Sequence, residues 1–157
     1  MVPMRAVIQR VSRAQVRARD VDGGEHVAGF DGEGLVVLLG VTHDDTDHQA
    51  RLLAEKTWRL RLLDQERSAE QAQAPVLAVS QFTLYGDARR GRRPSWSSAA
   101  PAAVGEPLYE RYVHHLRELG AMVHTGVFGA HMDLEIVNDG PVTLLLDTEE
   151  LGRPRRS

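Results

Sequence analysis

Apolar and polar residues alternate along the first part of the chain in the rhythm of β-strands. Residues 5–17 interleave β-branched and apolar side chains with polar ones, which predicts a first strand. A turn pattern rich in Asp and Gly at 20–24 separates this strand from a second one at 25–30. A further turn at 31–34 precedes the continuous apolar run 35–41, which predicts a strand buried on both faces. The pattern therefore predicts three consecutive strands joined by turns.

Two later segments follow the 3.6-residue period of an α-helix. Acidic residues and a threonine at 44–47 favour a helix start, because they cap free amides and suit the positive end of the helix dipole. This helix is expected to end near Leu60. A second helix is expected from Pro107, which suits a first helical turn, to Gly120, which suits a stop. Residues 65–74 lie between the two helices and are polar and weakly helical.

The rest of the pattern predicts more strands and one long loop. The expected strands are 75–79, 122–128, 132–137 and 142–147, and residues 87–104 are expected to form the loop. The count is about seven to eight strands and two main helices. Because strands come in groups instead of alternating with helices, we expect an α+β fold in which a curved β-sheet or barrel is flanked by the helices.

Composition narrows the possible functions. The 157 residues fit a single domain, 1–157, for which we expect flexible ends at 1–3 and 149–157. Cysteine is absent, which excludes a thiolate zinc site and a cysteine nucleophile. No apolar leader or membrane-length run occurs, so we expect a cytoplasmic protein without a membrane partner. The net charge of −3 argues against non-specific coating of nucleic acid, and no DNA partner is expected.

Several residue types that often carry chemistry favour structural interpretations here. Residues 43–48 contain two histidines and three aspartates but match no standard zinc spacing, and a helix cap explains them. We therefore expect no metal and no other cofactor. A lone histidine such as His124 or His131 is more often structural than a general base. The serines at 95–98 lack a Gly-x-Ser-x-Gly frame, so a standard triad is not indicated.

One candidate segment for a reactive site is the polar stretch that follows the apolar run at 75–79. It consists of Ser80, Gln81, Phe82 and Thr83. Composition alone allows a solvated strand end. It also allows the edge of a site, in which backbone amides hold a developing oxyanion and Thr83 offers a hydroxyl.

The other candidate segment is Asn-Asp-Gly-Pro-Val-Thr at 138–143. By composition it is a hairpin turn. Alternatively, the Gly140–Pro141 bond is cis, which directs carbonyl groups in ways that a normal strand cannot. Gly140 then lets a ligand approach the backbone closely.

Taken together, the two segments resemble the paired motifs of the D-aminoacyl-tRNA deacylase family. Further segments resemble the family in order and spacing, at 8–11, 38–41, 90–95 and 126–132, so the resemblance covers nearly the whole chain. It implies hydrolysis of the ester between a D-amino acid and the terminal ribose of tRNA, and activity on mischarged glycyl-tRNA. It also implies a homodimer with active sites at the subunit interface. In that dimer a cis Gly140–Pro141 bond of one subunit enters the pocket of the other and rejects L-aminoacyl groups.

The same resemblance assigns site residues. Catalytic residues would be Ser80, Gln81, Phe82 and Thr83, with the amides of the last two as the oxyanion hole. Thr83 would be a nucleophile or a positioning group, and we favour positioning because no base is evident beside it. The substrate and its terminal adenosine would contact Phe128, Gly129, Ala130, Met132 and Asn138. The tRNA phosphates would contact Arg89, Arg90, Arg92 and Arg93.

The chain departs from the family pattern in places, and three alternatives stay open. Residues 65–74 lack the Lys-Met-Asn segment of many members, and Trp96 stands where phenylalanine is usual. One alternative is a related deacylase that clears L-alanine from tRNA, against which the intact 80–83 segment argues. A second is a non-catalytic RNA-binding module, suggested by the arginine-rich loop. A third is a general small-ester hydrolase, which the missing triad disfavours.

Overall fold

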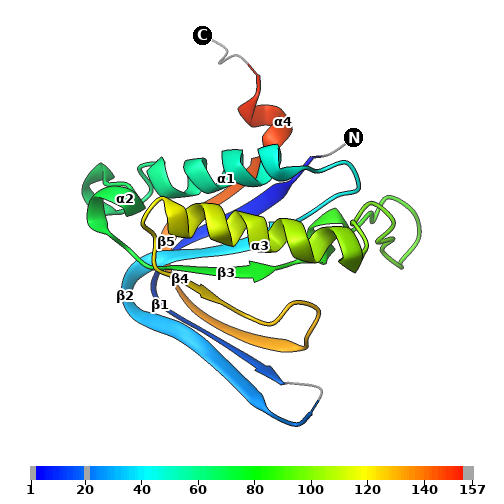
Figure 1. The fold of residues 1–157 in the computed structure, drawn as a ribbon, viewed down its shortest axis with the longest axis horizontal. Coiled ribbons are helices and arrows are strands. Elements are labelled where there is room, and N and C mark those ends of the chain that lie inside the picture. The colour runs from blue at the N-terminus through cyan, green and yellow to red at the C-terminus, as the bar shows by residue number, and fades with distance from the viewer. Residues whose placement is uncertain (1–2, 20–21, 154–157) are drawn as a thin grey trace.

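Five strands form one mixed sheet in the order β4-β3-β2-β1-β5 (Figure 1). The computed structural model describes residues 3–19 and 22–153. The strands are β1 (Arg5–Arg19), β2 (Glu25–Gly40), β3 (Val76–Ser80), β4 (Val123–Thr125) and β5 (Met132–Asp147). β1 pairs antiparallel with both β2 and β5, whereas β3 runs parallel to β2 and β4. β4 and β5 are therefore the two edges of the sheet.

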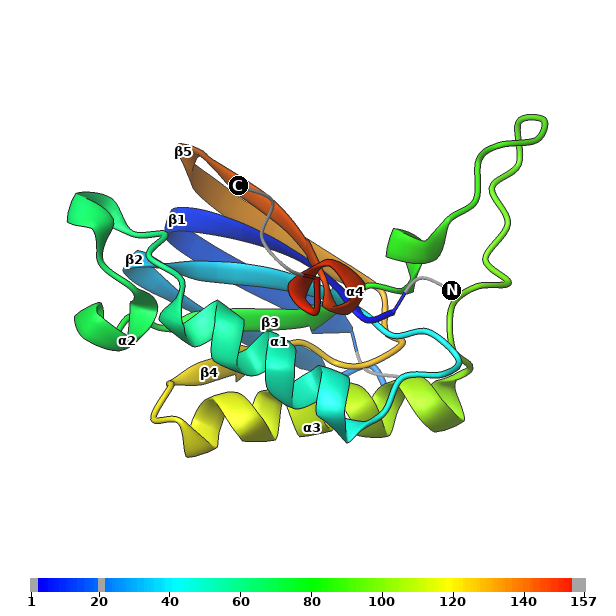
Figure 2. The ribbon, with the colours of Figure 1, turned by 90° about the horizontal axis from the view of Figure 1, so that it is seen from above.

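Two long helices lie side by side over one face of this sheet (Figures 1 and 2). They are α1 (Asp47–Arg59) and α3 (Ala102–Glu118), and the short helical segments are η1 (Asp64–Glu66), α2 (Ala69–Ala72), η2 (Phe82–Tyr85) and α4 (Thr148–Leu151). Thr46 caps α1 and Leu60 ends it, as the sequence predicted. α3 begins five residues earlier than predicted, because Pro101 and not Pro107 stands at its start. None of the described helices is long and apolar enough to cross a membrane.

The helices and the sheet enclose the larger of two hydrophobic cores. Leu53 and Trp58 of α1 and Tyr112 of α3 are almost fully buried in it against the sheet. The Tyr112 hydroxyl is 2.8 Å from Oγ1 of Thr57, which joins the two helices inside the core. The Tyr109 hydroxyl donates to the carbonyl of Ala78 at 2.6 Å, which fixes α3 against β3 just before that strand ends.

The opposite face of the sheet holds a second core, because the long strands curl over it (Figure 1). Val11 and Val16 of β1 pack there with Val36, Leu77 and Val79. The sheet stays open, since within the described residues its two edge strands are not paired with each other. The α+β class with flanking helices is thus confirmed, whereas a closed barrel is not found.

The expected count of seven to eight strands is wrong, and two irregularities explain most of the difference. Residues 25–30 and 35–41 were expected to be separate strands, but β2 runs through the predicted turn at 31–34. The glycine-rich turn sequence becomes a bulge opposite β1, in which Gly32 has a φ of 93°. Strand β1 pairs on both sides of this bulge, so tertiary pairing overrides the local turn preference.

Strand β5 shows the same effect at the second predicted turn. Gln9 pairs with Thr143 and Val11 with Asn138, so residues 139–142 stand opposite Arg10 alone. The expected strands 132–137 and 142–147 are therefore one strand interrupted by a four-residue bulge. The expected strand 122–128 shrinks to the three residues of β4, which pair with Val76, Leu77 and Ala78 of β3. Of the ends expected to be flexible, 1–3 and 149–157, residues 149–151 belong to α4, and 1–2 and 154–157 lie outside the described residues.

Candidate active site

The polar segment at 80–83 lies where the buried strand β3 leaves the sheet. Strand β4 stops pairing at Ala78, so Ser80 has β2 on one side and an open rim on the other. The amide of Gln81 still donates to the carbonyl of Leu39 at 2.8 Å. The chain then turns into η2, which starts at Phe82. The sequence thus places polar groups at the point where the sheet opens.

A pocket of about 270 Å³ lies against this strand end. Its walls come from the end of β3 and from the turn and strand start at 128–134, where Gly129 takes a φ of 75°. The lining residues are Val79, Ser80, Gln81, Phe82, Phe128, Gly129, Ala130, His131, Met132 and Leu134. The structure therefore brings together seven of the predicted site residues from two segments nearly 50 positions apart. His131 joins them, although as a lone histidine it was only a weak candidate in the sequence.

Thr83 lies beside this pocket without lining it. Its Oγ1 accepts a hydrogen bond from the side-chain amide of Gln81. Within the described residues no carboxylate or imidazole hydrogen-bonds this hydroxyl, so nothing there would remove its proton. The amides of Phe82 and Thr83 open η2, where no preceding turn accepts their hydrogens, and neither has an acceptor among the described residues.

The Gly140–Pro141 bond is cis, as the family resemblance implied, and it occupies the exposed bulge of β5. Arg10 holds this bulge from β1. Its guanidinium donates to the carbonyls of Asp139 at 3.1 Å and Gly140 at 3.4 Å and pairs with the Asp139 carboxylate at 3.1 Å. The side-chain amide of Asn138 donates to the carbonyl of Arg10 at 2.8 Å. Sequence reasoning assigned no role to Arg10, because its partners lie about 130 positions away.

Asn138, Gly140 and Pro141 do not line the pocket of their own chain. The bulge faces Arg10 of β1. Arg10 is in register with Leu35 of β2, and Leu35 is in register with Val76, the first residue of β3. It therefore lies about 13 Å along the strands and about 14 Å across them from the end of β3. The two predicted halves of the site are thus separate within one chain.

The arginine-rich loop projects from the body of the protein between η2 and α3 (Figure 2). Asp87 and Ser95 close its base with two backbone hydrogen bonds of 2.8 Å. The Asp87 carboxylate accepts hydrogen bonds from the Arg89 side chain at 2.9 and 2.7 Å, which lowers the pKa of Asp87 to about 2. The three remaining loop arginines are exposed and form no ion pair with any described residue; they are Arg90, Arg92 and Arg93. The described residues also contain no cluster of three or more metal-ligating side chains.

Comparison with known proteins gives matches along nearly the whole chain. A model of the D-Tyr-tRNA(Tyr) deacylase family matches residues 7–147. The chain is 58% identical over 146 residues to the D-aminoacyl-tRNA deacylase of Mycolicibacterium smegmatis, covering 92% of this chain and 99% of the relative. It is 59% identical over 147 residues to that of Nocardia farcinica, covering 92% and 100%.

Solved structures share the fold. A structure named c-Myc DNA Unwinding Element Binding Protein superposes with a TM-score of 0.80 at 34% identity, over 92% of this chain and 98% of the other. A probable eukaryotic D-amino acid tRNA deacylase gives 0.77 at 21% identity over the same shares, which shows the likeness of fold alone. Because the family model matches most of the chain and the relatives match at nearly full length, the protein belongs to the D-Tyr-tRNA(Tyr) deacylase family.

Proposed function

We propose that the protein hydrolyses D-aminoacyl-tRNA and releases the free D-amino acid and tRNA. The observation that carries this proposal is the pocket at the end of β3, where the segment 128–132 meets the start of η2 and its two amides that have no acceptor among the described residues. Relatives with more than half of their residues identical to this chain are named D-aminoacyl-tRNA deacylase. The reaction cleaves an ester and needs no cofactor.

The amides of Phe82 and Thr83 form the oxyanion hole in this proposal. Attack on the ester carbonyl places negative charge on its oxygen, and two preorganised amides stabilise that charge. Removal of one such donor typically costs about 3 kcal/mol of transition-state stabilisation. The aminoacyl ester is already labile, so these donors together with correct positioning suffice for hydrolysis.

Thr83 acts by positioning in this mechanism. A hydroxyl nucleophile needs an adjacent base, and the described residues provide none at Thr83. Its hydroxyl already accepts the Gln81 amide, so its own hydrogen is available to a substrate oxygen. Water is then the nucleophile, and the neighbouring ribose hydroxyl of the tRNA assists its attack. Phe128 and Met132 form the wall against the terminal adenosine.

Chirality is selected across a homodimer. The Gly140–Pro141 segment lies too far from the pocket of its own chain, so it contributes to a site only in a second copy. The outer edge of β5, which carries the bulge, is unpaired among the described strands, and Leu145 on this strand is 75% exposed. The segment enters the partner's pocket and blocks the side of the α-carbon that an L side chain would occupy. The side chain itself is not recognised, so D-amino acids of many kinds are accepted.

Glycine lacks the side chain that this device rejects, so glycyl-tRNA is hydrolysed as well. The tRNA is held in part by its phosphates, which contact Arg90, Arg92 and Arg93 in the projecting loop. Arg89 contributes less, because Asp87 already neutralises it. Aminoacylated tRNA is used in the cytoplasm, and that is where we place the protein.

A comparison of two esters tests the proposal. D-Tyr-tRNA and L-Tyr-tRNA are incubated with the protein at equal concentrations, and loss of the ester is followed with time. We expect fast loss of the D-ester and no loss of the L-ester beyond the rate without protein. Glycyl-tRNA should be cleaved too. Equal rates on the D- and L-esters, or loss of neither, would overturn the proposal.

A further inference from the structure

We infer that Trp96, set edge to face against Phe82, is a stacking platform for an unpaired base of the tRNA 3′ end, namely the base that precedes the terminal adenosine. This inference rests on the proposed function. The two rings meet edge to face, with centroids 5.5 Å apart and planes at 78°. They are 55% and 43% exposed, which is unusual for aromatic side chains in contact. Their free faces therefore lie in solvent next to the pocket.

The platform is held firmly by the surrounding backbone. A Cβ atom on Gly86 would lie 2.7 Å from the ring of Trp96, so this glycine allows the indole to rest directly on the chain. Ser97 and Ser98, which follow Trp96, are fixed through their carbonyl oxygens. His43 Nε2 lies 2.7 Å from the carbonyl of Ser97, and Oγ1 of Thr42 donates to that of Ser98 at 2.6 Å. The ring is thus anchored at the foot of the loop and not at its tip.

The position of the pair defines which nucleotide it meets. Phe82 lines the pocket that receives the terminal adenosine in the proposed function, whereas Trp96 stands outside that pocket. Arg90, Arg92 and Arg93 lie in the part of the loop that the backbone hydrogen bonds between Asp87 and Ser95 close off, and Trp96 directly follows this closure. The loop itself projects from the body of the protein (Figure 2). A single-stranded nucleic acid that leaves the pocket along this path passes the ring of Trp96 first and the loop arginines next.

Single-stranded nucleic acid is the ligand that uses both features. Its bases stack on aromatic rings and its phosphates pair with arginine, and each stacked base typically contributes a factor of about 5 to 150 in affinity. An acidic peptide would use the arginines but would leave the aromatic faces in water. The observations therefore favour the 3′ end of the tRNA as the occupant of this surface.

Substrates of different length test the platform. We would compare D-Tyr-tRNA with D-tyrosyl-adenosine, which lacks the preceding nucleotides, in Trp96→Ala, Trp96→Phe and wild-type protein. Trp96→Ala should lower kcat/KM on the tRNA about 10-fold, mainly through KM. Its kcat/KM on D-tyrosyl-adenosine should stay within about 2-fold of wild type. Trp96→Phe should keep most of the activity on both.

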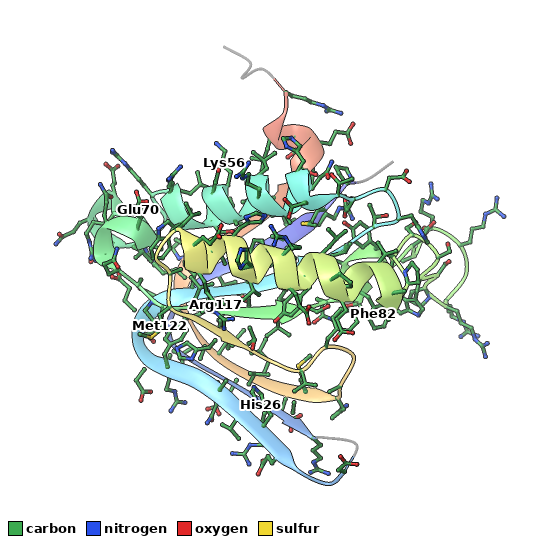
Figure 3. All side chains as sticks on the ribbon, in the orientation of Figure 1. His26, Lys56, Glu70, Phe82, Arg117 and Met122 are labelled. Carbon is green, nitrogen blue, oxygen red and sulfur yellow. The ribbon has the colours of Figure 1, made fainter. Side chains whose placement is uncertain are left out.

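Met122→Ala is the matched control, because Met122 is 67% exposed at the far end of the sheet from Phe82 (Figure 3). It should leave both substrates unaffected. If Trp96→Ala impairs both substrates equally, Trp96 only supports Phe82 and the platform is wrong. An unchanged KM for the tRNA overturns it as well. If wild-type protein cleaves neither ester, the proposed function fails, and the binding measurement that follows still tests the platform.

Fluorescence gives this binding readout without catalysis. Trp96 is one of two tryptophans, and the other, Trp58, is 1% exposed. A base stacked on Trp96 should quench its emission when the trinucleotide cytidylyl-cytidylyl-adenosine or uncharged tRNA is added. Trp96→Phe should abolish the quenching, and added salt should weaken it because phosphate contacts contribute. Binding of the trinucleotide, shown by equilibrium dialysis, without any change in emission would overturn the platform.

Discussion

The segments 80–83 and 138–141 lie on strands with opposite surroundings. The first follows β3, whose residues Val76, Leu77 and Ala78 are fully buried between two cores. Its backbone is fixed by β2 and, through Tyr109, by α3. The second lies on the edge strand β5, where all four of its residues are exposed. Its described side-chain contacts come chiefly from Arg10.

This difference shows which contacts determine the conformation of each segment. The strand end at 80–83 is determined by its own chain, because the burial of β3 forces the polar residues to the rim. The bulge at 138–141 forms no part of a pocket in its own chain, yet Arg10 holds two of its carbonyl groups in place. The proposed homodimer accounts for this contrast, because the bulge would then act in the pocket of a second copy.

The largest effect is expected from Gly140→Ala, which acts on the bulge alone. A Cβ atom on Gly140 meets only Oδ1 of Asn138, at 3.7 Å, so the fold of the chain should tolerate it. In the partner's pocket the added methyl group should displace the substrate, and a displacement of about 1 Å can cost about 100-fold in rate. We expect kcat/KM on D-Tyr-tRNA to fall about 100-fold at an unchanged Tm.

Gly152→Ala is its matched control. This glycine has an ordinary φ, and its added Cβ would meet only the carbonyls of Glu149 at 3.6 Å and Thr148 at 3.7 Å, both in ordinary contact. It should change neither activity nor Tm. Full activity of Gly140→Ala would show that the bulge does not enter a site, and the contrast between the two segments would lose its functional meaning.

A smaller effect is expected from Thr83→Ala at the other segment. The substitution removes the hydroxyl that accepts the Gln81 amide but leaves the backbone amides of η2 in place. If Thr83 positions the substrate, kcat should fall about 10-fold and measurable activity should remain, since the oxyanion hole persists. Complete loss of turnover with the substrate still bound would instead identify Thr83 as the nucleophile.

Thr46→Ala provides a comparison for that experiment. Thr46 also forms a threonine–glutamine hydrogen bond, with Oε1 of Gln49 at 2.7 Å, but at the start of α1. Its loss should lower stability by about 1 kcal/mol, as for other helix caps, without changing kcat. Comparing Thr83→Ala with Thr46→Ala shows whether a change in kcat comes from losing a threonine–glutamine hydrogen bond anywhere or from losing it at the site.

Local sequence patterns predicted those parts of the fold that depend on neighbours in the chain. Thr46 caps α1 as expected, because capping involves residues within one turn. The same reasoning failed at 31–34 and 138–143, where turn sequences became bulges inside long strands. Pairing with β1 determines the conformation of those segments, and the local sequence pattern does not predict that pairing.

The site shows the same division. Burial of the run before Ser80 could be predicted from apolar residues alone, and so could polar groups at its end. That Phe128 and Met132 complete the pocket came from resemblance, since both are distant in sequence from the end of β3 that they face. The contact of Arg10 with the bulge was missed, because it depends on the pairing of β1 with β5. Long-range strand register is the information that sequence patterns lacked.

The smallest effect is expected in the helical layer that supports both segments. Asp47 at the start of α1 accepts hydrogen bonds from Arg111 at 2.9 Å and from His115, whose Nε2 lies 2.8 Å away. These bonds lower the pKa of Asp47 to about 2, and the bond from Arg111 contributes most. A carboxyl group whose pKa is lower in the folded state than in the unfolded state, where it is about 3.9, stabilises the fold above that value. This contribution disappears as the pH falls through about 2.

Asp47→Asn should therefore unfold at a lower urea concentration than wild type at pH 6, by a small margin because the pair is exposed. The margin should shrink between about pH 4 and pH 2, where the wild-type carboxylate becomes protonated and other carboxyl groups affect both proteins alike. Deacylation at neutral pH should be unchanged, because neither segment contacts this ion pair. A margin that stays constant down to pH 2 would show that the charge of Asp47 does not stabilise the helical layer. Loss of deacylation at neutral pH would instead show that the two helices α1 and α3 are coupled to segments 80–83 and 138–141. The difference between these two segments would then not depend on their own strands alone.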